Sequence, residues 1–267
     1  MVAVEEAEYF RPTVSGISRV DTRRGCTDLL GTQLSVHYSV NKLVASKMPL
    51  PEHPLTVRGG CNCRAVRYKI QIPSLGDRPF HPYLDKIKSG ENVHLPMIAI
   101  DHCNDCRRAT GAVLPLWLCS PINYITSSLL RRSAASQSPT TKADGDSDEE
   151  HRRGPWLSAE EIFRPGLSGD DSFLTAFVSS DARTRYFCGR CGTNIGYRIS
   201  PMPEGWPEML DVMMGTIDKK DLDSDAMIPE RAVWVDHSIG WVKKLAREGL
   251  GNIPQHPLTN VSIQAQE

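Results

Sequence analysis

The sequence predicts a mainly β fold with few, short helices. Two observations carry this prediction. Apolar and polar residues alternate with a period of two in several short stretches, and turn-forming residues separate these stretches from one another. The chain has 267 residues, of which 40% are hydrophobic and 24% charged, a composition typical of a globular protein rather than a disordered one.

The first clear strand is expected at residues 66–72, where apolar and polar residues alternate strictly until Pro73 ends the run. Ser158 and Glu161 form a possible capping box for a short helix, and residues 239–250 offer a second helix. Further strand-like runs are residues 114–119, 173–178, 183–187, 195–199, 210–214 and 232–235.

The chain is expected to hold one folded domain between two extensions. Residues 1–56 show weak patterning and are predicted to be a poorly structured extension, and residues 251–267 a tail. The domain between them, residues 57–250, carries an insertion at about 131–155 that is rich in Ser and Thr and contains a dense run of acids. Such a segment buries too little apolar surface to offset its ordering entropy, so we expect a mobile loop.

Charge and hydrophobicity disfavour nucleic acid and membranes as partners of this chain. Lys and Arg number 31 and Asp and Glu 32, for a formal net charge of −1. This balance disfavours a protein that binds nucleic-acid phosphates, which is normally basic. The sequence contains no run of 18 consecutive apolar residues, so a transmembrane helix is not expected. The acidic first ten residues do not resemble a secretory signal. We expect a cytoplasmic protein, with a nuclear location left open.

Eight cysteines are the most informative feature. In a reducing compartment they favour metal binding or catalysis over disulfides. Cys26 and Cys119 stand alone and are expected to be inert thiols. The other six form three close pairs, which are Cys61/Cys63, Cys103/Cys106 and Cys188/Cys191.

Two of the pairs predict a closed zinc site. Cys188 and Cys191 are separated by two residues on a glycine-bearing turn, a spacing that places two sulfurs on one ion. Cys61 and Cys63 are expected in an extended strand, where alternate side chains share a face. Four thiolates complete one tetrahedral site. The third pair, Cys103 and Cys106, either holds a second ion less completely or is a spare pair of reduced core thiols.

Several motifs in this order resemble one known family. The matching stretches are Gly60–Tyr68, Asp101–Gly111, Phe187–Thr193, Met214–Asp218 and Trp234–Asp236. They resemble the G-x-C-x-C-G-x-V-x-Y, C-H-C-x-x-C-R-R-x-T-G, F-C-x-x-C-G-[ST], G-T-[LI]-D and W-x-[DE] signatures of glutathione-dependent formaldehyde-activating enzymes and centromere protein V. The resemblance covers roughly residues 57–245.

This resemblance implies packed antiparallel sheets of the zinc-binding β-tent type with zinc at two places. The implied structural zinc is bound by Cys61, Cys63, Cys188 and Cys191. The family holds its second zinc through three cysteines with one open position. Here Asp101 replaces the first of them beside Cys103 and Cys106, and a carboxylate is a harder ligand that zinc also accepts. His102 is a further candidate by residue type.

The resemblance also implies carbon–sulfur lyase chemistry with glutathione as co-substrate, through Cys103, Cys106 and Asp101. The electrophile is a small aldehyde such as formaldehyde. Arg107 and Arg108 either bind carboxylates of glutathione, for which a guanidinium is suited, or are surface charges. Asp236 and His237 are candidates for proton transfer, although a structural role is favoured.

Two further functions compete with this enzyme. One is a zinc-structured binding module of the same fold without catalysis. The other, a nucleic-acid-binding zinc ribbon, is disfavoured by the near-neutral charge. Metal stoichiometry together with glutathione binding separates the enzyme from the module.

Overall fold

The structure is a computed structural model, and it describes residues 50–82, 93–133, 153–164 and 171–248. Nearly all of the predicted N-terminal extension, the centre of the acidic insertion and the C-terminal tail lie outside these residues. The prediction that the insertion is mobile therefore stays a prediction.

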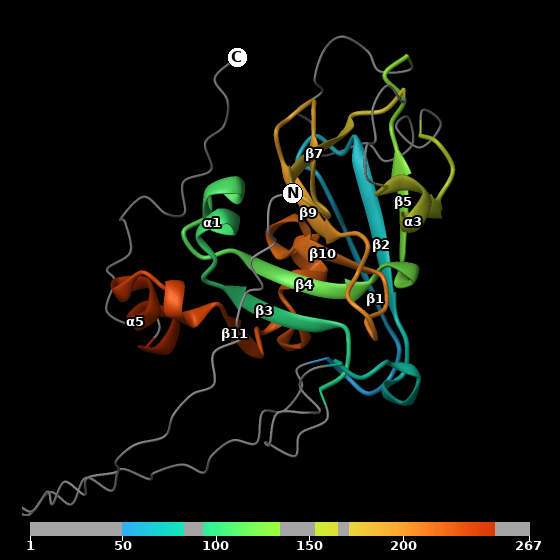
Figure 1. Cartoon of the computed structure of the whole chain (residues 1–267). Coiled ribbons are helices and arrows are strands. Elements are labelled where there is room, and N and C mark those ends of the chain that lie inside the picture. The colour runs from blue at the N-terminus through green and yellow to red at the C-terminus, as the bar shows by residue number, and fades with distance from the viewer. Residues whose placement is uncertain (1–49, 83–92, 134–152, 165–170, 249–267) are drawn as a thin grey trace, which may run out of the picture. The chain divides into compact units, whose positions relative to one another are not determined.

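The described strands form two sheets, so the predicted mainly β class is confirmed (Figure 1). The smaller sheet has the spatial order β1 (Leu55–Gly60), β2 (Val66–Ile72), β5 (Ile125–Leu129), β6 (Leu157–Ser158). The larger has the order β11 (Arg231–Val233), β3 (Met97–Asp101), β4 (Leu116–Pro121), β10 (Met209–Met213), β9 (Asn194–Ile199), β8 (Arg183–Cys188), β7 (Leu174–Ser180). Neighbouring strands are antiparallel except for β11 and β3.

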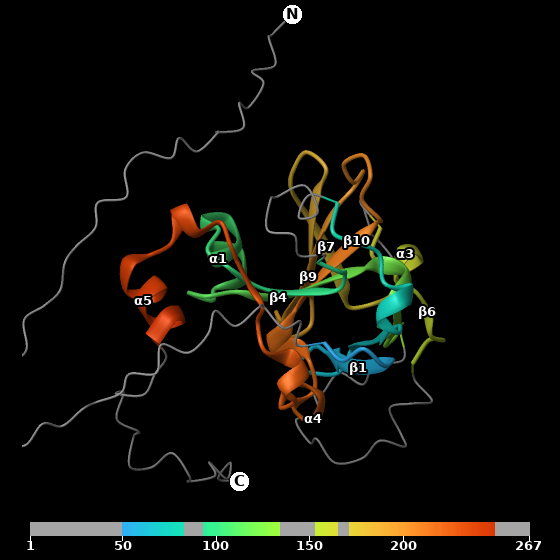
Figure 2. The same cartoon turned by 90° about the horizontal axis from the view of Figure 1, so that it is seen from below.

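The described helices are short: α1 (Asn104–Thr110), α3 (Ala159–Ile162), α4 (Lys219–Leu222) and α5 (Gly240–Glu248). As predicted, Ser158 caps α3, accepting a hydrogen bond from the backbone N–H of Glu160. Figures 1 and 2 agree that α1 and α5 lie at the β3 end of the larger sheet, away from the smaller one. Single 3₁₀ turns lie at Leu75–Asp77, Ile122–Tyr124, Met214–Thr216, Asp225–Met227 and Val235–His237.

The main core lies between the two sheets. Strand β2 contributes its alternating apolar residues, and every one of them is buried, as the period of two predicts. The larger sheet contributes one of its faces, whose buried residues face one another across the strands. This row comprises Ile98 on β3, Leu118 on β4 and Val212 on β10.

The opposite face of the larger sheet forms the floor of a cavity. Because side chains alternate between faces along a strand, the neighbours of the core residues turn away from the core. Among them, Ala99 on β3 and Trp117 on β4 are cross-strand partners and both line a cavity of about 1300 Å³. Helix α1 contributes to its wall through Asp105, Cys106 and Arg108. The alternation therefore gives the sheet one structural face and one face open to a ligand.

Two local predictions differ from the structure. Cys61 and Cys63 lie in the turn after β1, not in an extended strand, because Arg64 N–H bonds to Cys61 O (2.9 Å) and reverses the chain. Strand β11 ends at Val233, before the predicted 235, because Trp234 adopts a left-handed conformation with φ of 57° that interrupts the extended chain.

The folded region also starts earlier than residue 57. Strand β1 begins at Leu55, and Leu50 is buried in the core. None of the helices in the described ranges is long and apolar enough to cross a bilayer.

Candidate metal centres

The four-cysteine group is assembled from two turns. Cys61 and Cys63 follow β1, whereas Cys188 is the last residue of β8 and Cys191 lies in the turn after it. The four sulfurs lie within 4.8 Å of one another. Those of Cys61 and Cys63 are 3.6 Å apart, and those of Cys63 and Cys188 are 3.7 Å apart. A tetrahedron with Zn–S bonds of about 2.3 Å has edges of about 3.8 Å, so this group could hold a metal ion and is compatible with zinc.

Glycines allow both turns to form. Gly60 precedes Cys61, and a Cβ there would lie 2.2 Å from the carbonyl oxygen of Val66. Gly192 follows Cys191 with φ of 75°, where a residue with a side chain is strained. The C-x-C and C-x-x-C-G spacings thus meet as the sequence predicts, although through two turns.

The backbone around this group favours thiolates. The Val66 N–H points at the sulfur of Cys61 at 3.3 Å. The pKa of Cys188 is lowered to about 5 because Cys61 donates a hydrogen bond to its sulfur and the backbone N–H groups of Arg190 and Cys191 point at it. Burial, in contrast, raises the pKa of Cys63 to about 11. A bound cation would stabilise all four deprotonated sulfurs.

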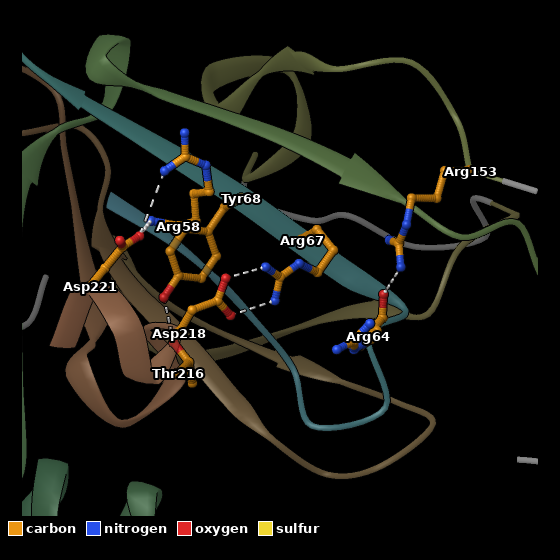
Figure 3. Close-up of polar contacts among 8 residues, drawn as sticks. All are labelled: Arg58, Arg64, Arg67, Tyr68, Arg153, Thr216, Asp218 and Asp221. Carbon is orange, nitrogen blue, oxygen red and sulfur yellow. Dashed lines mark hydrogen bonds and ion pairs between the residues drawn. The ribbon is translucent and has the colours of Figure 1, made fainter. Parts of the chain in front are cut away.

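The Gly215–Asp218 segment fastens the hairpin that carries Cys61 and Cys63 (Figure 3). Arg67, on β2, donates two hydrogen bonds to the carboxylate of Asp218, at 2.9 and 2.5 Å. The buried hydroxyl of Tyr68 bonds to the hydroxyl of Thr216 at 2.8 Å. The backbone N–H of Asp218 also bonds to the carbonyl of Arg58 on β1 at 2.9 Å. This segment therefore holds both strands of the hairpin.

Asp218→Asn is expected to loosen the four-cysteine group. The bidentate Arg67–Asp218 pair is partly exposed, so we expect a loss of about 1–2 kcal/mol in unfolding free energy and faster metal transfer to a chelator. Arg67 lowers the pKa of Asp218. Its stabilisation is therefore complete above the ordinary carboxyl pKa and is lost as the pH falls toward the lowered value. Urea unfolding and chelator kinetics measure both effects.

The matched control is Asp223→Asn, which breaks the exposed Lys219–Asp223 pair in the neighbouring helix. Exposed pairs contribute little, so this variant should match the wild type. Equal chelator kinetics in Asp218→Asn and Asp223→Asn would show that Asp218 does not hold the hairpin.

The second group joins Asp101, at the end of β3, with Cys103 and Cys106 at the start of α1. Their ligand atoms lie within 4.8 Å of one another, and all three residues line the cavity. Three donors beside a cavity could hold a metal ion with a position open for a ligand. His102 is buried next to them but is not part of this group.

Two hydrogen bonds orient Asp101. Its Oδ1 accepts from the backbone N–H of Cys103 at 2.8 Å, and its Oδ2 accepts from the indole N–H of Trp117 at 2.9 Å. A carboxylate offers about four lone-pair sites, so Asp101 keeps capacity for a metal. Hydrogen bonds of this kind commonly fix the orientation of a metal-binding carboxylate.

Arg185 on β8 places its guanidinium against Cys106. The two Nη atoms lie 3.9 and 3.7 Å from the sulfur, and the group stacks over Tyr197 at 5.0 Å. Burial and the nearby Asp101 raise the pKa of Cys106, while Arg185 opposes them. Neither Arg185 nor Trp117 was predicted from the sequence as a site residue. The alternation of Arg183 and Arg185 along one strand was the available signal for Arg185.

The other predicted residues lie in different places. Arg108 is exposed and lines the cavity, whereas Arg107 does not line it. Asp236 and His237 are exposed in the last 3₁₀ turn and also do not line the cavity. Cys119 lines the cavity outside both donor groups.

Comparison with models of known protein families and with curated proteins found no match. The family resemblance therefore depends on the five motifs alone. Three of these motifs contribute donors to the two groups of potential metal ligands.

Proposed function

We propose that this chain is a zinc-dependent carbon–sulfur lyase of the type of glutathione-dependent formaldehyde-activating enzymes, with their β-tent fold. Its substrate is a glutathione adduct of a small aldehyde or other electrophile. The observation that supports this most is the contrast between the two donor groups. Four cysteines form a complete ligand set, whereas Asp101, Cys103 and Cys106 offer three donors on the wall of a cavity of about 1300 Å³.

The second group would supply a catalytic metal with its ligands. Zinc bound there would act as a Lewis acid that holds a thiol as thiolate and polarises an aldehyde oxygen. Asp101 is pre-oriented for this role by Trp117. Arg185 offsets negative charge at Cys106, since two thiolates and a carboxylate together outweigh the charge of a divalent cation.

The proposed reaction is reversible addition. In the synthetic direction the thiol sulfur forms a bond to the aldehyde carbon, the π electrons of the carbonyl move to its oxygen, and that oxygen receives the proton which the thiol gives up. The lyase direction reverses each change. Arg108 is the predicted carboxylate-binding residue that lines the cavity, so we assign it to a glutathione carboxylate.

A binding module without catalysis is the alternative, and one observation favours it. Both oxygens of Asp101 already accept hydrogen bonds. A carboxylate in place of a third thiolate also holds zinc less tightly, so the second group of such a module would remain weakly metallated.

Exchange between formaldehyde, glutathione and their adduct separates the two functions. Two-dimensional NMR exchange spectroscopy on the zinc-loaded chain should show turnover above the uncatalysed rate, and Cys106→Ser should abolish the increase. Glutathione binding without any increase would identify the module. If no thiol binds and no exchange is accelerated, both proposals fail.

A further inference from the structure

A continuous row of six side chains crosses the cavity floor. Strand pairing places Phe177, Arg185, Tyr197, Asp211, Cys119 and Met97 opposite one another on successive strands from β7 to β3. All six line the cavity. Residues in one row point to the same face of a sheet, so these six side chains together form one continuous surface of the cavity.

Asp211 is the acid of this row, and it lies in the middle of the sheet. Its pKa is raised to about 7, because burial and, to a smaller extent, the nearby Asp101 raise it more than a hydrogen bond with Cys119 lowers it. The neighbour on the other side is Tyr197. The ionised form of a buried carboxyl beside a ligand-sized cavity is stabilised most by a cationic group of the ligand that pairs with it.

The cationic side of the cavity lies on other elements. Arg185 and Arg183 are on β8 and Arg108 is on α1, and all three line the cavity. Neighbouring strands are about 4.8 Å apart, so the backbones of Arg185 and Asp211, separated by β9, are about 10 Å apart. The cavity therefore offers opposite charges at a separation that suits an extended ligand rather than a small ion.

Asp211 is not one of the donors of the second metal group. Arg185, not Asp211, contacts Cys106. Asp211 lies two strands from Arg185, with the two backbones about 10 Å apart. A separation of this size suits the far end of a peptide-like thiol whose sulfur is held near Cys106.

We propose that Asp211 is the specificity residue of this cavity and accepts the free ammonium group of a zwitterionic, amino-acid-bearing thiol whose carboxylates face the arginines. This inference rests on the proposed function, because the sulfur end of the ligand is placed at Asp101, Cys103 and Cys106. It adds a requirement that the thiol chemistry alone does not impose. The substrate must carry a free amino group away from its sulfur.

Calorimetric titration of the zinc-loaded full chain tests this requirement with two probes, glutathione and N-acetylglutathione. They share the thiol and both carboxylates, but only the first has an ammonium group. The wild type should bind glutathione about tenfold or more tightly, whereas Asp211→Asn should bind both probes equally. Asp181→Asn, in the exposed turn before β8, is the matched control and should keep the wild-type preference.

The outcomes separate this inference from the proposed function. Equal binding of the two probes by the wild type overturns the ammonium site and leaves the lyase intact, and this result does not depend on any variant folding. A preference retained in Asp211→Asn also overturns it. Binding of 2-mercaptoethanol with no binding of glutathione overturns it as well. Failure of every thiol to bind contradicts the proposed function, and the ammonium site falls with it.

Discussion

Replacing Cys188 by serine is expected to release one zinc ion per chain and to unfold the protein at room temperature. Cys188 is fully buried, and its sulfur lies 3.7 Å from that of Cys63. Structural zinc sites contribute about 10–16 kcal/mol in small zinc domains, which matches or exceeds the usual stability of a domain of about 5–15 kcal/mol. Elemental analysis and circular dichroism measure the two effects.

Cys119→Ser is the matched control, because Cys119 belongs to neither donor group. It should keep the zinc content of the wild type and remain folded. A folded Cys188→Ser protein with unchanged zinc would contradict the four-cysteine site.

Asp101→Ala is expected to lower the affinity of the second group for zinc by about tenfold or more and to abolish formaldehyde–glutathione exchange. The variant removes one of three donors and leaves the indole N–H of Trp117 without its partner. Asp101→Cys should act in the opposite sense and raise the zinc content towards two per chain, since thiolate is the softer ligand. Competition with a chromogenic chelator measures both affinities.

Trp117→Phe isolates the orienting hydrogen bond from the ligand itself. It should weaken zinc binding less than Asp101→Ala while leaving the four-cysteine site fully loaded. Identical zinc content in wild type, Asp101→Ala and Asp101→Cys would exclude the carboxylate as a ligand.

The sequence predicted the strands and the donors that depend on local pattern. The alternation at residues 66–72 matches β2 residue for residue, because one face of that strand is buried in the core. The spacing of Cys188 and Cys191 likewise predicted a turn that brings two sulfurs together. Both features are set within a few residues of chain.

Features that depend on pairing distant strands could not be predicted. Nothing near Asp211 indicates that it lies opposite Cys119 and Tyr197, because the order of β4, β10 and β9 fixes those neighbours. The contact of Arg185 with Cys106 joins residues 79 positions apart. Helix α1 was missed because it buries only Cys106 and so shows no apolar period.

Zinc X-ray absorption spectroscopy, with and without glutathione, tests the central claim most directly. We assign four sulfurs to one ion and two sulfurs plus the Asp101 carboxylate to the other. Adding glutathione to the fully loaded chain should therefore raise the sulfur share of the mean coordination shell and lower the oxygen share. A shell that contains sulfur alone, or one that glutathione leaves unchanged, would contradict an open second site that binds thiols.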